Sequence, residues 1–146
     1  MQTEKVIDYI VNWLKDYATK AGVKGFVIGV SGGVDSGVVS TLCAMTGLKV
    51  LALEMPIRQQ KDQASRALEH IDFLKNKFPN VEGFTVDLNE PFEALYKTFD
   101  VKDDEFPAEK LAFANTRSRL RMLTLYYYGQ INGLLVCGTG NKVEDF

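Results

Sequence analysis

Four short apolar runs, separated by longer amphipathic segments, constrain the fold of this chain more than any other feature. The runs occupy residues 26–30, 49–53, 83–88 and 133–138. The first run has no alternation of apolar and polar residues, as is typical of a parallel strand that helices cover on both faces. Apolar residues recur at helical spacing in the flanking segments, at residues 1–20, 38–45, 60–76, 89–99 and 107–130. The pattern predicts an α/β fold with right-handed crossovers and a doubly wound parallel sheet.

Length and charge narrow the class of protein. The 146 residues fit a single domain over residues 1–146. With 17 basic and 19 acidic residues the formal net charge is −2, which disfavours a polybasic nucleic-acid binder. Every apolar run is far shorter than the roughly 18 residues that a membrane-spanning helix needs. We therefore expect a soluble, cytoplasmic protein with neither a nucleic-acid nor a membrane partner.

Cysteine and histidine are too few, and too far apart, for the usual zinc sites. The two cysteines, Cys43 and Cys137, lie inside apolar segments and lack CxxC spacing, and His70 is the single histidine. Neither a zinc site nor a disulfide framework is expected from this pattern.

The strongest motif is the sequence GVSGGVDS at residues 29–36, between the first predicted strand and the next predicted helix. Gly32 and Gly33 allow a ligand to approach the backbone closely, and Ser31 and Ser36 add hydroxyl donors. The N–H groups at the start of the following helix favour an anion, so the segment reads as a phosphate cradle. No lysine follows, which separates it from the GxxxxGK[ST] loop. The alternative is an ordinary glycine turn in which Asp35 or Ser36 caps the helix.

A second motif, NTRSRLRM, lies at residues 115–122 on the long predicted helix. At helical spacing Arg119 shares a face with Asn115, Met122 and Tyr126, while the rest of the helix is largely apolar. We expect both sides of this helix to be covered, one by the core and the other by a second subunit. An arginine buried there needs an anionic partner, which is either a protein carboxylate or a substrate phosphate or carboxylate.

A third motif, GTGNKVE, follows the last predicted strand at residues 138–144. Ligands of doubly wound folds gather at the carboxyl ends of the strands. There, Thr139 can donate to a phosphate or ribose, Lys142 can neutralise phosphate charge, and Glu144 can bind magnesium together with Asp35. The alternative is an ordinary polar loop.

The three motifs, in this order, resemble those of ammonia-dependent NAD synthetases, a family of PP-loop ATP pyrophosphatases with a Rossmann-like fold of the adenine nucleotide alpha hydrolase type. The resemblance implies magnesium ligation by Asp35 and Glu144, and contacts of Arg119 and Asn115 with deamido-NAD. The ATP-binding residues that it implies are Gly29, Val30, Ser31, Gly32, Gly33, Val34, Asp35, Ser36, Gln60 and Thr139.

The resemblance also implies a reaction. ATP adenylates the nicotinate carboxylate of deamido-NAD, ammonia then displaces AMP to give NAD, and the enzyme is a homodimer. Ser118, Val143 and Glu54 depart from residues common in the family. Because the chain ends soon after the fourth predicted strand, we expect it to be incomplete at its C-terminus. Two alternatives remain: an adenylating enzyme that modifies tRNA, and a non-catalytic module for nucleotide binding or dimerisation.

Overall fold

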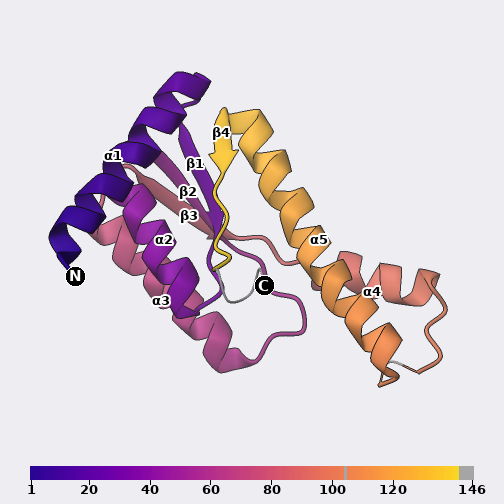
Figure 1. The fold of residues 1–146 in the computed structure, drawn as a ribbon. Coiled ribbons are helices and arrows are strands. Elements are labelled where there is room, and N and C mark those ends of the chain that lie inside the picture. The colour runs from indigo at the N-terminus through magenta and orange to yellow at the C-terminus, as the bar shows by residue number, and fades with distance from the viewer. Residues whose placement is uncertain (104, 142–146) are drawn as a thin grey trace.

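The computed structural model describes residues 1–103 and 105–141 (Figure 1). In chain order the elements are α1 (Thr3–Ala21), β1 (Gly25–Gly29), α2 (Val34–Met45), β2 (Lys49–Glu54), α3 (Lys61–Lys77), β3 (Val81–Thr85), α4 (Asn89–Thr98), α5 (Pro107–Asn132) and β4 (Leu134–Val136). The strands form one parallel sheet in the order β3-β2-β1-β4. The predicted α/β fold with a parallel sheet is confirmed.

Two hydrophobic cores lie on opposite faces of the sheet. Phe26 and Ile28 of β1 belong to the core beneath α1, α2 and α3. Their neighbour Val27 belongs to the other core, together with Phe92 of α4 and Phe113 of α5. Successive side chains of a strand point to opposite faces, so a strand covered on both sides is apolar at every position. Figure 1 shows these two layers, with α1–α3 on one side of the sheet and α4 and α5 on the other.

The helix ends follow from local chemistry. Gly22 ends α1 and Gly133 ends α5, both in the left-handed conformation, with φ angles of 72° and 67°. Glycine adopts this conformation without the steric penalty that a Cβ brings. Pro107 is the first residue of α5, where a missing N–H costs no hydrogen bond. None of the helices in the described part of the chain combines the length and the hydropathy that a membrane crossing requires.

The third strand differs from its prediction. It was expected at residues 83–88 but occupies Val81–Thr85, and only Val81 of its residues is buried. The side chain of Asn80 fixes its start, because Nδ2 donates to the carbonyl oxygens of Ala44 and Leu48 at 2.9 and 2.7 Å. The pairing of β3 with β2 ends at Thr85, opposite Glu54. Beyond it Val86 and Leu88 still donate their N–H groups to the carbonyls of Glu54 and Pro56 at 2.8 and 3.1 Å, but Pro56 has no N–H to donate in return.

The fourth strand is also shorter than predicted, with three residues, Leu134–Val136, against the expected 133–138. Beyond it the chain still follows β1, since the backbone N–H of Cys137 donates to the carbonyl of Val27 at 2.9 Å. Because β1 pairs with both β2 and β4, the segments that leave the carboxyl ends of β1 and β4 are neighbours. The helix after β1 lies on one face and the helix before β4 on the other, which is a topological switch point.

Candidate functional site

The glycine-rich segment after β1 folds into a loop closed by its two serines. The backbone N–H of Ser31 donates to Oγ of Ser36 at 3.1 Å, and the two hydroxyl oxygens lie 3.1 Å apart. The N–H of Gly33 donates to Oγ of Ser31 at 3.2 Å, and the Ser36 hydroxyl donates to the carbonyl of Gly33 at 3.2 Å. The N-cap residue of α2 is Gly33, and it makes no side-chain cap. Ser36 therefore holds the loop to its own helix and is buried in doing so.

Gly32 is required by both conformation and packing. Its φ of +86° is in the left-handed region, and a Cβ at this position would lie 2.7 Å from the carbonyl oxygen of Gln63 in α3. Val30 anchors the start of the loop, because its N–H donates to the carbonyl of Leu53 in β2 at 2.8 Å. The loop is thus held close to α3 and β2, with the first turn of α2 directly after it. The first N–H groups of a helix have no partner within the helix and attract anions.

The segment after β4 lies next to the glycine-rich loop and contacts the start of α2. Nδ2 of Asn141 donates to Oδ2 of Asp35, in the first turn of α2, at 3.0 Å. The structure therefore brings together two motifs that are more than a hundred residues apart in the sequence. Thr139 lies between Cys137 and Asn141 and is partly buried.

A cavity of about 460 Å³ opens between the two segments and α5. Gly29, Val30 and Ser31 line it from the glycine-rich side, and Gly138 and Thr139 from the strand-end side. The wall from α5 is formed by Ser118, Arg121, Met122, Leu125 and Tyr126. The cavity thus has hydroxyl, backbone and guanidinium donors at the carboxyl ends of β1 and β4, where doubly wound folds bind ligands.

Arg121 is the functional candidate that the sequence did not single out. Its Nε donates to the carbonyl of Met55 at 3.0 Å, which fixes the half-buried side chain at the carboxyl end of β2. Burial, and then the positive charge of Arg117, lower the pKa of the Arg121 guanidinium. Within the described residues no ion pair joins either arginine to a carboxylate. The sequence signal that could have singled out Arg121 is its i, i+4 spacing from Arg117, which places both arginines on one face of the helix.

A second polar cavity, of about 390 Å³, lies beside Arg121. Arg117, Gln59 and Gln60 line it together with Arg121, which therefore borders both cavities. Gln60, predicted on the adenine side, is the N-cap residue of α3 and faces this second cavity. Two neighbouring guanidinium groups and amide side chains are suited to an anionic or strongly polar ligand group.

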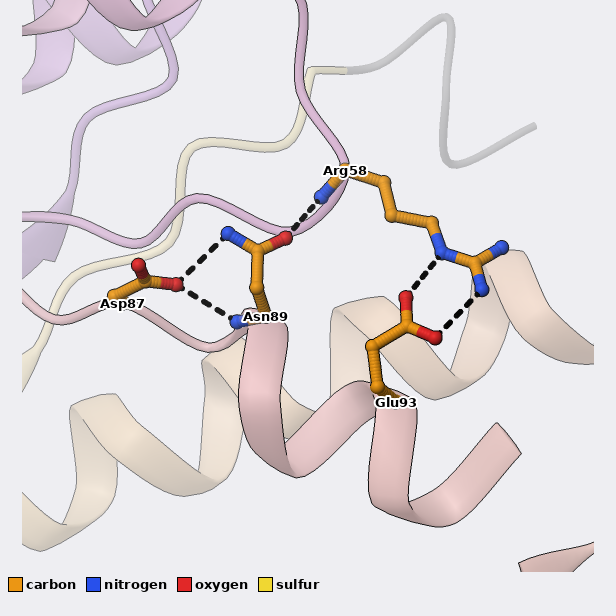
Figure 2. A network of polar contacts seen from close by, with 4 residues as sticks. All are labelled: Arg58, Asp87, Asn89 and Glu93. Atoms are coloured by element: carbon orange, nitrogen blue, oxygen red, sulfur yellow. Dashed lines mark hydrogen bonds and ion pairs between the residues drawn. The ribbon is translucent and has the colours of Figure 1, made fainter. Parts of the chain in front are cut away.

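The loop that carries Gln59 and Gln60 is fixed by Arg58, which sequence reasoning missed (Figure 2). The N–H of Arg58, at a φ of 48°, donates to Oδ1 of Asn89 at 2.7 Å. Nε and a terminal nitrogen of its guanidinium donate to the two oxygens of Glu93 at 2.6 and 3.0 Å. Asp87 accepts from the backbone and side chain of Asn89 in turn. The hydrogen bonds from Arg58 hold the pKa of the Glu93 carboxyl below its usual range.

Within the single chain Arg119 is exposed, so its predicted burial depends on a second subunit. Arg119 and Asn115 are both exposed, and neither lines the cavities described here. The face of α5 on which they lie also exposes Met122, Leu123 and Tyr126, by 52%, 66% and 61%. With its other side α5 packs on the sheet and α4, and among the described residues only the cavity of about 460 Å³ adjoins Met122 and Tyr126 on this face.

The loop residues Gly32, Gly33 and Val34 face a different cavity, of about 760 Å³, between α1 and α2. Its lining is mostly aliphatic, and among the residues that the structure describes Thr41, Arg66 and His70 supply its polar side chains. It is larger than the cavity beside Thr139, but its lining is almost entirely apolar, and apart from the backbone of Gly32 and Gly33 its donors are Thr41, Arg66 and His70. We therefore place the candidate site at the smaller, more polar cavity.

One of the two predicted magnesium ligands, Asp35, lies within the described residues. Asp35 offers a carboxylate beside the loop, and the segment after β4 brings the side chain of Asn141 to it. A carboxylate next to a phosphate cradle suits Mg²⁺, which is commonly bound by one or two carboxylates together with substrate phosphates. Glu144 and Lys142 lie outside the described residues. Among the described residues no cluster of three His, Cys, Asp or Glu side chains forms a metal site.

The fold and the site define a class: a doubly wound α/β protein with a glycine-rich loop at its topological switch point. The family model described as NAD synthase matches residues 6–146, and the chain belongs to the NAD synthase family.

Individual relatives agree with this assignment. The NH(3)-dependent NAD(+) synthetase of Mesoplasma florum is 38% identical over 145 residues, which make up 99% of this chain and 57% of that protein. The solved NH3-dependent NAD synthetase of Campylobacter jejuni, in complex with the nitrate ion, has 29% identity and a TM-score of 0.84, covering 99% of this chain and 59% of that one. The NMN synthetase of Francisella tularensis has 34% identity and a TM-score of 0.82, covering 97% and 56%. The chain spans just over half the length of these relatives.

Proposed function

We propose that this protein is a C–N bond-forming ligase that adenylates the nicotinate carboxylate of deamido-NAD with ATP and amidates it with ammonia. One observation carries the proposal beyond family membership. The hydrogen bond from Asn141 to Asp35 joins the glycine-rich loop to the strand-end motif, beside a cavity of about 460 Å³ with polar donors. That arrangement suits a nucleotide whose phosphates lie on the loop.

The loop supplies donors for the polyphosphate. Gly32 and Gly33 leave the backbone open to a ligand, and the start of α2 adds N–H groups and a positive dipole end. Ser31 is exposed and lines the cavity, so its hydroxyl is available to a phosphate oxygen. Mg²⁺, held by Asp35 and by the phosphates themselves, would neutralise negative charge on the polyphosphate.

The chemistry needs positioning more than a protein nucleophile. A carboxylate oxygen of the nicotinate group attacks the α-phosphorus of ATP, the bond from that phosphorus to the bridging oxygen breaks, and pyrophosphate leaves. Ammonia nitrogen then attacks the carbonyl carbon and loses a proton, and AMP leaves with the electron pair of the acyl C–O bond. Orientation and charge stabilisation by fixed donors accelerate steps of this kind. Arg121, fixed on Met55 between the two polar cavities, is well placed to stabilise negative charge.

We also propose that the exposed face of α5 is the contact of a homodimer. Arg119, Met122, Leu123 and Tyr126 share this face, and a second copy would bury them. Arg119 would then need an anion, and the acidic group of deamido-NAD would supply it. Exposure in a single chain and a substrate role in a dimer are therefore compatible.

Release of pyrophosphate from ATP tests the proposal. The protein is incubated with ATP, Mg²⁺ and ammonia, and with deamido-NAD, nicotinate mononucleotide or tRNA as the second substrate. Release that depends on deamido-NAD supports the proposed reaction. Release that depends on tRNA contradicts it in favour of a tRNA-modifying enzyme, and ATP binding without any release favours a non-catalytic module.

Nicotinate mononucleotide is included because of one comparison. The Francisella tularensis relative is an NMN synthetase, and it is as similar to this chain as several NAD synthetases are. Both substrates present the same nicotinate carboxylate, so the mononucleotide is the second candidate. A higher kcat/KM for the mononucleotide than for deamido-NAD would reassign the substrate and leave the adenylation chemistry intact.

A further inference from the structure

Arg58 has a backbone conformation that residues other than glycine rarely adopt. Its φ of 48° lies in the left-handed region, and Asp100, at 51°, is the only other non-glycine residue of the described chain in that region. A glycine would adopt this conformation without the steric cost that a Cβ brings. Costly backbone conformations persist where surrounding contacts stabilise them, and they are concentrated at functional sites. The contacts that Arg58 makes must therefore compensate for this cost.

One face of α4 supplies these contacts. Asn89, Phe92, Glu93 and Tyr96 follow one another at spacings of three, one and three residues, which places them on one side of the helix. Figure 2 shows the backbone nitrogen of Arg58 at Asn89, at 2.7 Å, and its guanidinium at the two oxygens of Glu93, at 2.6 and 3.0 Å. The guanidinium carbon also lies 5.0 and 4.6 Å from the ring centroids of Phe92 and Tyr96. These four residues form the α4 seat of Arg58.

The α4 seat differs from an ordinary surface ion pair. The side chains of Arg58 and Glu93 are 40% and 42% exposed, and ion pairs this exposed contribute little unless their geometry is bidentate. Here the pair is bidentate, the ring of Phe92 is fully buried, and a further hydrogen bond holds the backbone. Arginine can form such a fork and stack on aromatic rings, whereas lysine cannot form the fork. The seat therefore requires arginine at residue 58.

The α4 seat holds the middle of the loop that leads from β2 to α3. Before Arg58, the carbonyl of Met55 accepts a hydrogen bond from Nε of Arg121 at 3.0 Å. After Arg58, both Gln59 and Gln60 line the polar cavity of about 390 Å³, and Gln60 is the N-cap residue of α3. Because the two glutamines follow Arg58 directly, release of Arg58 from α4 would displace their amides relative to Arg121.

The seat also relates this loop to α5. The guanidinium carbon of Arg117 lies 5.9 Å from the ring centroid of Phe92, and Arg117 lines the same polar cavity. Phe92 packs edge-to-face on Phe113 of α5, with the ring centroids 5.8 Å apart. Arg58 and Arg117 therefore contact one buried ring, and α4 fixes the loop relative to the arginines of α5.

We propose that Arg58 is a positioning residue for the nucleotide: seated on α4, it holds Gln59 and Gln60 beside the guanidinium groups of α5 and thereby sets the affinity for ATP. The inference rests on the proposed function, because it takes the ligand of the polar cavity to be a polar group of the nucleotide. Arg58 acts through the two glutamines, since Glu93 and the aromatic rings engage its guanidinium. Groups that are fixed in advance lose less conformational freedom when a ligand binds.

Titration calorimetry with ATP and Mg²⁺ tests the inference on the protein and three variants. Arg58→Gln and Glu93→Gln should each weaken ATP binding by about tenfold, because a small displacement of binding groups has a large effect. The double variant should bind no more weakly than either single variant, since both substitutions break one contact. Unchanged affinities, or losses that add in the double variant, would overturn the inference and leave the proposed function standing. An unmodified protein that binds no ATP would contradict the proposed function, and this inference with it.

Two other substitutions separate the side chain of Arg58 from its backbone. Arg58→Gly adopts a φ of 48° without steric cost but loses the α4 seat, so it should lose as much affinity as Arg58→Gln. Arg58→Lys keeps the charge and loses the bidentate geometry, so its affinity should lie between those of the unmodified protein and Arg58→Gln. Full affinity of Arg58→Gly would show that the turn alone matters and would overturn the inference.

A purely structural role of Arg58 would change stability without changing the nucleotide site. Leu14→Val alters a buried residue of α1, in the core on the other face of the sheet, and is the control for lost stability. In the pyrophosphate-release assay, Arg58→Gln should raise the KM for ATP and leave kcat nearly unchanged, because the phosphates are proposed to lie on the glycine-rich loop. Leu14→Val should change neither constant. An equal rise of KM in both variants, or a fall in kcat alone, would overturn the inference.

Discussion

Nδ2 of Asn141 donates a hydrogen bond to Oδ2 of Asp35 at 3.0 Å, and so joins the end of the described chain to the first turn of α2. The contact exists because β4 pairs with β1, which places the segments after these two strands at one edge of the sheet. Asp35 is thereby held beside the glycine-rich loop by a neutral donor, and its charge is not cancelled by a cation at this contact.

Replacement of Asp35 by Asn should weaken Mg²⁺-dependent ATP binding by about tenfold or more, which corresponds to about 1.4 kcal/mol per tenfold. The amide keeps the shape of the carboxylate and an oxygen that can accept from Asn141, but it loses the charge that favours a cation. Titration calorimetry with ATP and Mg²⁺ measures the change. Asp72→Asn, which removes an exposed carboxylate from α3, is the matched control and should leave the affinity unchanged. Equal affinities of the two variants would argue against Asp35 as the magnesium ligand.

Gly32→Ala should lose nucleotide affinity in addition to stability. A Cβ at Gly32 combines a φ of +86° with an approach of 2.7 Å to the Gln63 carbonyl, so the loop must move away from α3. Gly47→Ala is the control, because Gly47 has a φ of +75° and nothing within 4 Å of its added Cβ. The left-handed conformation costs both variants about 1–2 kcal/mol of unfolding free energy. Denaturant unfolding and ATP titration should show that only Gly32→Ala loses binding.

Sequence patterns predicted the architecture because the signals are local. The helix ends depend on local residues, namely the glycines after α1 and α5 and the proline that begins α5. The buried strands likewise appear as short apolar runs in the sequence. The predicted end of β3 was wrong because it depends on the partner strand: Thr85 pairs with Glu54, and Pro56, which lies beyond β2, has no N–H with which to continue the ladder. Strand length is set by the partner strand, which a single-sequence pattern does not reveal.

The parts of the candidate site that belong to local sequence motifs were predictable. The parts that depend on contacts between residues far apart in the sequence were not. The glycine-rich loop and Thr139 were found from their place after strands. Arg58 was missed because its role comes from Glu93 and Asn89, which follow it by more than thirty residues. Arg119 was expected to be buried from its apolar neighbours, but helical spacing gives a shared face without showing what covers it.

The Arg58–Glu93 pair should make stability depend on acidic pH. Because the folded-state pKa of Glu93 is lowered from 4.5, the pair stabilises the protein fully above pH 4.5 and loses this contribution as the pH falls through the lowered value. Glu93→Gln should therefore be less stable than the unmodified chain at pH 7, and the difference should shrink towards zero in more acidic solution. Urea unfolding from neutral to acidic pH measures it. A difference that grows on acidification would contradict this sign.

Arg119→Ala should raise the KM for deamido-NAD by about ten- to a hundredfold, since hydrogen bonds to charged groups contribute about 1.5–3 kcal/mol. The KM for ATP should change little, because Arg119 lies outside the cavity beside the glycine-rich loop. Lys110→Ala removes another exposed cation from α5 and is the control. If both variants changed the KM equally, the effect would be one of general charge and not of a contact made by Arg119.

If the protein forms the proposed dimer, Leu123→Lys should make it a monomer. Leu123 is 66% exposed on the face of α5 proposed as the dimer contact, and a charge there would remain unpaired in the interface. Leu68→Lys, at a 42% exposed position of α3, should leave the dimer intact. Sedimentation velocity at micromolar concentration distinguishes these outcomes. A monomer without any substitution would contradict the proposed assembly.

The central claim is that the loop from Ser31 to Ser36 binds the polyphosphate of ATP. A crystal structure of the protein with a non-hydrolysable ATP analogue and Mg²⁺ tests it most directly. The account predicts phosphate oxygens within hydrogen-bonding distance of the backbone N–H groups of this loop, with the metal on Asp35. An analogue bound elsewhere, with the loop free of phosphate, would contradict it.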